Sequence, residues 1–219
     1  MMCLLGMTAG VNAVHRVASL VLAKDFISET QLADLACQES RLTHWSPLSQ
    51  ATCVALCVIC RHLINGMTWV NAIQSFLQVY ATRGTLASTS STSHNSSDDS
   101  NEDSDPMALV TLHITQALRP EYKSQLNRGG FAPLVLSTAV YFVHHSDSFN
   151  QALSSSIDFA GLQNYCPVLV GALAGARYGV DEVVRCAGGA HLAHCNEGRR
   201  AGLIARLTKA CEKMSADHS

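Results

Sequence analysis

Apolar residues recur three and four positions apart along most of the chain, which is the spacing of an amphipathic helix. No segment alternates between apolar and polar residues as a half-buried strand does, and no turn dipeptide joins two β-rich segments. The sequence therefore predicts an all-α fold. The predicted helices are residues 13–23, a segment beginning after Ser28, then 47–65, 68–80, 106–118, 131–144, 147–158, 167–178, 181–186 and a basic helix at 199–214.

Several of these helices have clear start and stop signals. Ser28 and Gln31 have the spacing of a capping box, in which each side chain bonds the other residue's backbone N–H. Ser46-Pro47 places a cap before a proline at the first helical position, and Asn65-Gly66 is typical of a helix end. Thr68 is predicted to cap the next helix.

The pattern is interrupted between residues 85 and 105. This window holds eight serines and five acidic residues, with no Lys or Arg. It lacks the apolar residues needed to pack, so we expect a disordered insertion, either a plain linker or a phosphorylated switch. We expect a single domain over residues 1–219 around this insertion, with a flexible tail at 215–219.

Glycines mark the helix predicted at 167–178. Gly171, Gly175 and Gly179 follow one another at every fourth position. A glycine inside a helix costs about 1 kcal/mol relative to alanine, so the stripe needs a compensating reason. We expect another backbone to pack closely against it at the centre of the domain.

Composition narrows the class of protein. The net charge is −2 and the pI about 6.5, with no concentrated basic face, which argues against a nucleic-acid partner. No apolar run approaches the roughly 20 residues of a membrane span, and the N-terminus has no charged region typical of a signal peptide. We therefore expect a cytoplasmic protein that does not contact membranes, with its nine cysteines reduced.

Two cysteine and histidine patterns could bind metals. Cys53, Cys57 and Cys60 have the C-x3-C-x2-C spacing of a radical-SAM iron–sulfur site, but helical spacing also places them on one buried face, which we favour. His191 and His194 lie one helical turn apart, either as zinc ligands or in a glycine-rich loop, and the loop is favoured because no C-x2-C partner exists.

Four segments in order carry a more specific signal. They are GVNAVHRVASLVL from Gly10, THWSP from Thr43, GGFAPLVLSTAVYFVHHSDSFNQAL from Gly129 and DFAGLQNYCPVLVGALAGARYG from Asp158. Together they resemble the ADP-ribosylglycohydrolase family, which includes dinitrogenase-reductase-activating glycohydrolases and J-crystallins. The resemblance implies an orthogonal multi-helix bundle that binds ADP-ribose and magnesium and hydrolyses the bond between ADP-ribose and a protein side chain.

The resemblance also implies positions for the substrate and the metal. It places Gly10, Asn12 and Arg16 in the family's early glycine-asparagine segment, and Thr43 and His44 at the edge of the pocket. Arg16 is either a phosphate partner or a solvated surface charge, and His44 either faces the nucleotide or lies in an ordinary turn before Ser46. These five residues are the predicted substrate-binding residues.

The metal positions depart from the family pattern. Alignment on GALAGA puts Leu162 and Asn164 where the family has two aspartates, and Tyr165 where it has threonine. Asn164 is the one residue left as a metal ligand, with a single neutral oxygen. Asp158, the nearest remaining acid, is interpreted as a solvated or capping carboxylate. The family's N-terminal G-D-x-x-G helix and D-D-T triplet have no counterpart, so the chain is either a divergent enzyme or a fragment of one.

Two functions follow from this comparison. The first is an ADP-ribosyl hydrolase whose magnesium binding is lost or weak and whose activity is weak or absent. The second is a non-catalytic protein on the same scaffold that binds ADP-ribose or ADP-ribosylated protein, or has a structural or interaction role. Loss of the first helices would expose an apolar face, so self-association is also predicted.

Overall fold

The computed structural model describes residues 9–23, 25–87, 105–162 and 165–186. Within these ranges every regular element is helical, and the single β-type pairing is an isolated bridge between Gly10 and Phe131. This confirms the all-α prediction. The elements are α1 (Asn12–Val17), η1 (Ala18–Ala23), α2 (Glu29–Arg41), α3 (Pro47–Ile64), α4 (Trp69–Ala87), α5 (Pro106–Ala117), η2 (Pro120–Gln125), α6 (Ala132–His144), α7 (Phe149–Ala160) and α8 (Tyr165–Cys186).

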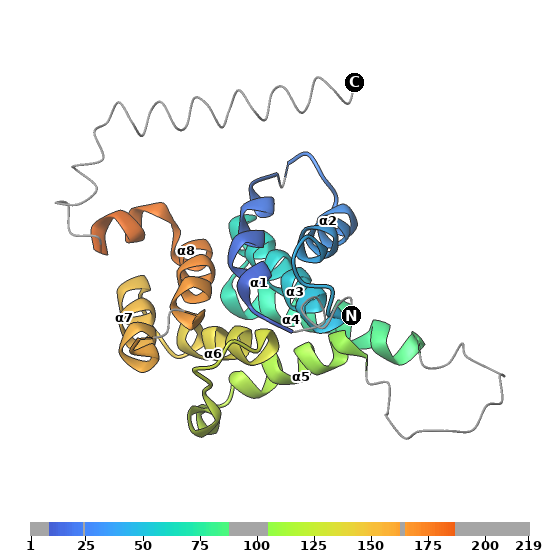
Figure 1. The fold of residues 1–219 in the computed structure, drawn as a ribbon. Helices are drawn as coiled ribbons and strands as arrows, with labels where there is room; N and C mark the ends of the chain where they lie inside the picture. Colours follow the sequence, from blue (N-terminus) through green and yellow to red (C-terminus); the bar gives the residue numbers. More distant parts are fainter. Residues whose placement is uncertain (1–8, 24, 88–104, 163–164, 187–219) are drawn as a thin grey trace.

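Helix α3 is the core of the bundle. It contacts α1, α2, α4, α5, α6 and α8, and thirteen of its eighteen residues are buried (Figure 1). By length and composition it is also the one helix in the described ranges that could cross a membrane. Helix α3 is a core helix, because the other helices of the bundle cover its apolar side chains on nearly all sides.

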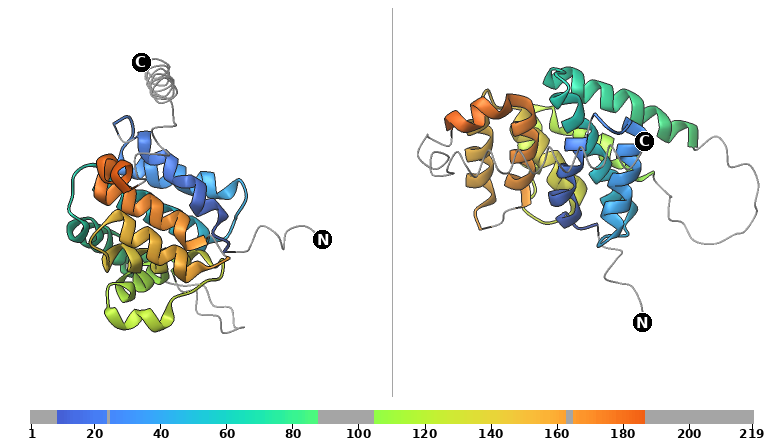
Figure 2. Two further views of the ribbon diagram at one scale, coloured as in Figure 1. Left: turned by 90° about the vertical axis from the view of Figure 1, so that its left-hand side faces the viewer. Right: turned by 90° about the horizontal axis from the view of Figure 1, so that it is seen from above.

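The remaining helices surround α3 in two groups. Helices α7 and α8 pack side by side, and α6 crosses beneath them (Figure 1). Seen from above, α7 and α8 lie at one end of the molecule while α2 and α4 lie toward the other (Figure 2, right). This crossing of helices matches the orthogonal bundle that the family resemblance implies.

Local chemistry sets most helix starts. Ser28 accepts a hydrogen bond from the Gln31 N–H, and the Gln31 side chain accepts one from the Ser28 N–H, so the predicted capping box is present. Asp105 caps α5 through the Met107 N–H at 3.0 Å. Ser46 precedes α3 as predicted but is buried and makes no side-chain cap bond, so Pro47 is the operative signal there.

Several boundaries differ from the predicted ones. Helix α4 continues to Ala87, two residues past the predicted start of the insertion at Thr85, while residues 88–104 lie outside the described ranges. The last turn of the predicted 13–23 helix is 3-10, and the η2 turn at Pro120–Gln125 was not predicted. Helix α8 begins at Tyr165 rather than Pro167, and the predicted break before residue 181 is present as a non-helical Gly179. The predicted 199–214 helix and the 215–219 tail also lie outside these ranges.

The prediction of close packing on the glycine stripe is wrong for the part of the chain that the structure describes. A Cβ added at Gly171 or Gly175 would meet no atom within 4 Å apart from the helix's own backbone and the adjoining residues. The same holds at Gly179, where the positive φ of 80° is the reason for glycine. Within the described residues the three glycines therefore border open space.

Candidate functional site

The first predicted site segment is held where α1 begins. Gly10 pairs with Phe131: the Val11 N–H donates to the Gly130 carbonyl at 3.0 Å, and the Ala132 N–H donates to the Ala9 carbonyl at 2.8 Å. The Ser49 hydroxyl of α3 donates to the Gly10 carbonyl at 3.0 Å. Gly10 is thus a backbone junction that fixes α1 against α3 and the start of α6.

Asn12, the next predicted residue, is the first residue of α1 and is exposed. Asn12, His15 and Arg16 share one face of α1, because positions three and four apart lie above one another on a helix. This face therefore carries an amide, an imidazole and a guanidinium side by side.

Arg16 joins the second predicted segment to the first. Its Nε donates to Glu39 Oε1 in an ion pair, and Nη2 donates to the Glu39 carbonyl at 3.1 Å and to Thr43 Oγ1 at 2.7 Å. The structure thus brings Arg16, Thr43 and His44 together, as the family resemblance implies. Arg16 is paired with Glu39, and its side chain is still 37% exposed, so the phosphate-binding and solvated alternatives both stay predictions.

His44 is held neutral by this arrangement. Thr43 Oγ1 accepts from Arg16, so its own proton is available to His44 Nδ1, which lies 2.8 Å away. Burial, followed by the nearby Arg16 charge, lowers the pKa of His44 below its ordinary value. The neutral ring therefore presents an Nε2–H donor.

His15 and Tyr165 complete the site and were not predicted as site residues. The neutral His15 ring donates from Nε2 to the Tyr165 carbonyl at 3.0 Å, and the two rings stack with centroids 6.2 Å apart. A Cβ on Gly130 would come within 3.6 Å of the Tyr165 ring. Partial burial lowers the pKa of His15. No sequence motif marks this contact, because it joins residues 150 positions apart.

Three segments thus converge on α1, and together they define what we call the α1 site. Its members are Gly10, Asn12, His15, Arg16, Thr43, His44 and Tyr165. A substrate-binding role for Gly10, Asn12, Arg16, Thr43 and His44 stays a prediction.

The donor set of the α1 site does not suit a pair of magnesium ions. Mg²⁺ prefers carboxylate and water oxygens. Glu39 is the one carboxylate bonded into this network, and its pairing with the Arg16 guanidinium places a positive charge beside it. Its second oxygen is buried and unbonded in the described part of the chain. Among the residues with described positions, no three His, Cys, Asp or Glu side chains are grouped to hold a metal.

The late segment adds no described carboxylate to the α1 site. Leu162 is fully exposed, and Asn164, the predicted metal ligand, lies outside the described residues. Asp158 is exposed on α7 and lines a separate cavity of about 420 Å³ with Lys123 and His145. It is therefore a solvated carboxylate, as interpreted from the sequence.

The cysteine and histidine patterns do not form competing metal sites within the described ranges. Burial raises the pKa of Cys53 and Cys60 to about 12, and that of Cys57 well above its ordinary value. These thiols stay protonated in the core of α3, whereas metal ligands must be thiolates. His191 and His194 lie outside the described residues.

The comparison with known families agrees with this architecture. The chain matches the family described as ADP-ribosylglycohydrolase over residues 5–215 of its 219. No curated protein matches it significantly. The match covers nearly the whole sequence, including all four segments that carried the resemblance.

Proposed function

Because this chain belongs to the ADP-ribosylglycohydrolase family, we propose that it binds the ADP-ribose part of modified substrates at the α1 site and hydrolyses the glycosidic bond weakly or not at all. The family assignment supports the kind of substrate. The chemistry of the side chains at the site supports the weak hydrolysis.

The observation that carries the proposal is the position of Leu162. Its side chain is fully exposed just before α8, so it contributes nothing to the core. An exposed leucine gains no stability from burial, which means that packing does not require it there. The resemblance gives this position an aspartate, and the substitution removes a hard anionic ligand. The dehydration of a divalent ion then has little to offset it.

The remaining polar groups are better suited to binding than to catalysis. Asn12 offers an exposed amide, Thr43 a hydroxyl and His44 a neutral Nε2–H. These groups can bond ribose hydroxyls or diphosphate oxygens without a net charge. The His44 Nδ1 already accepts a hydrogen bond from Thr43, so it is not free to accept a proton from an attacking water.

A second candidate function is protein interaction without ADP-ribose. Three large apolar side chains near these segments are exposed: Trp45, Phe131 and Leu162. Phe131 pairs with Gly10, and Trp45 immediately precedes the helix whose Ser49 bonds Gly10. Exposed apolar groups of this kind are typical of interaction surfaces.

The test compares the native chain with the Leu162→Asp/Asn164→Asp variant. Both are incubated with peptides ADP-ribosylated on arginine or on serine, with magnesium or with EDTA, and released ADP-ribose is measured. We expect the native chain to release ADP-ribose at the rate of the buffer control in both conditions. A magnesium-dependent turnover in the native chain near ordinary enzyme values, about 1 s⁻¹ or more, would refute the proposal.

Binding is measured separately by calorimetric titration with free ADP-ribose. Saturable binding that weakens in Thr43→Val and His44→Leu supports the α1 site. Absence of any binding by the folded native chain would favour the interaction function instead. The Leu162→Asp/Asn164→Asp variant is the matched control, because it adds two carboxylates that could bind a metal ion. Leu162 is exposed, so its replacement leaves the described core unchanged.

A further inference from the structure

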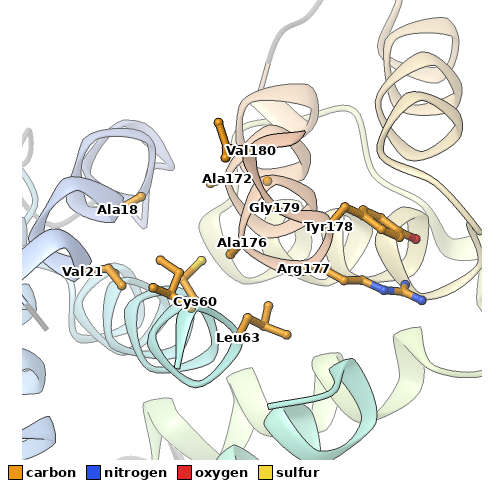
Figure 3. A pocket seen from close by; sticks show the side chains of 12 residues that line it. Ala18, Val21, Cys60, Leu63, Ala172, Ala176, Arg177, Tyr178, Gly179 and Val180 are labelled. Atoms are coloured by element: carbon orange, nitrogen blue, oxygen red, sulfur yellow. The ribbon is translucent and has the colours of Figure 1, made fainter. Parts of the chain in front are cut away.

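A groove lined mostly by apolar residues, with Arg177 and Tyr178 at one edge, runs between η1, α3 and α8. It has a volume of about 560 Å³. Ala18 and Val21 form one side and Cys60 and Leu63 the floor, while Ala172, Ala176, Gly179 and Val180 face them from α8 (Figure 3). Gly175 also lines it, and a Cβ added there would meet nothing within 4 Å.

The side of the groove on α8 is made of small residues although nothing described fills the space. Gly175 costs α8 about 1 kcal/mol relative to alanine. The rim residues Ile64 and Val180 are 42% and 60% exposed. An apolar notch of this shape admits the side chains of another helix at close range, since ridges of one helix pack between those of its neighbour.

One segment outside the described residues has the matching pattern. In residues 199–214 six apolar side chains share one side of a helix: Leu203, Ile204, Leu207, Ala210, Cys211 and Met214. At 100° per residue they cover a face about 120° wide that also includes Arg200 near its start, while Ala201, Ala205, Arg206, Lys209, Glu212 and Lys213 fall outside it. The segment is therefore predicted to be an amphipathic helix that needs an apolar surface to cover it.

The length and origin of the segment also fit. Helix α8 ends at Cys186, only six residues after Val180 on the groove rim. The connection of residues 187–198 can span up to about 40 Å when extended, and a helix of residues 199–214 is about 24 Å long. The family match extends to residue 215, so it includes this segment within the family domain.

We propose that residues 199–214 dock as a helix in the groove between η1, α3 and α8 of the same chain. The apolar face around Leu203 and Leu207 covers the groove, and the basic face remains in water. Gly175 and Gly179 of α8, which line the groove, then have a close partner. This contact is independent of substrate binding at the α1 site.

The groove side is tested with Gly175→Leu in the full chain, followed by hydrogen–deuterium exchange. In the native chain we expect amides of 199–214 to be protected, and in the variant to exchange about tenfold faster or more, because the new side chain occupies the groove. Trypsin cleavage at Arg206 and Lys209 should accelerate in parallel. If the groove is empty in the native chain, Gly175→Leu will leave the exchange of residues 199–214 unchanged. It will also raise the Tm, because leucine has a higher helix propensity than glycine. That result would overturn the proposal.

The segment side is tested with Leu207→Asp and its matched control Ala205→Asp, which places the same charge on the opposite face. We expect Leu207→Asp alone to remove the protection of 199–214. Equal effects of the two variants would overturn the proposal. So would protection that grows with protein concentration alongside a dimer in light scattering, or protection that appears only with anionic phospholipid vesicles.

Discussion

At the scale of single residues, the α1 site is a set of side chains that already satisfy one another. Arg16 was predicted either to bind phosphate or to be solvated, and the structure shows in addition an ion pair with Glu39, 23 residues further along the chain. Sequence spacing could not reveal this pair, since the two residues lie on different helices. The closeness of Arg16, Thr43 and His44 was predictable only through the family resemblance.

The partly buried histidines predict a loss of stability in acid. Burial lowers the pKa values of His15, His113 and His144 below their ordinary 6.5 in the folded chain. Below about pH 6.5 the unfolded chain therefore binds more protons than the folded one, so the free energy of unfolding falls as the pH falls toward 5. Urea denaturation at a series of pH values measures this slope.

His113 provides the matched variant for this pH series. Its Nδ1 is buried and unbonded within the described structure. His113→Leu removes one titrating group and its unsatisfied nitrogen, so we expect a shallower fall in stability below pH 6.5. An unchanged slope in His113→Leu would show that burial of this ring does not control the acid response.

At the scale of helices, the residues at which helices begin could be predicted from the sequence, but the contacts between helices could not. The capping box at Ser28 and the cap at Asp105 depend on residues within three positions, so the sequence contains all that is needed. The η2 turn has no side-chain cap, and its one start signal is Pro120 at the first position. The glycine stripe of α8 was correctly placed on a helix, but its expected partner backbone is not among the described elements, because what covers a helix depends on distant parts of the chain.

Replacing either of two glycines of α8 by alanine is expected to change the stability of the fold, in opposite directions. Gly171 is helical and has open space where a Cβ would stand, so Gly171→Ala should stabilise the fold by about 1 kcal/mol and raise the Tm by roughly 2–4 °C. Gly179 has φ 80° and ψ 171°, a region nearly confined to glycine, so Gly179→Ala should destabilise by about 1–3 kcal/mol. The Tm values of Gly171→Ala, Gly179→Ala and the native chain test both expectations. A lower Tm for Gly171→Ala would show that another part of the chain covers α8 at Gly171.

At the scale of the whole molecule, α3 supplies a rigid centre against which the site is assembled. Ser49 of α3 bonds Gly10, and α1 in turn contacts Tyr165 at the start of α8. Composition and periodicity predicted an all-helical protein but not this convergence, which joins residues as far apart as His15 and Tyr165. The family resemblance supplied the missing long-range information, and the match over residues 5–215 confirms it.

The central proposal is that this member of the ADP-ribosylglycohydrolase family binds ADP-ribose without help from magnesium, because the polar groups described at the α1 site do not suit two magnesium ions. The most direct measurement is the dissociation constant of ADP-ribose for the native chain, determined by calorimetry in excess magnesium and again in excess EDTA. We predict the same constant in both conditions. Tightening by magnesium of about tenfold, equivalent to 1.4 kcal/mol, would contradict the account.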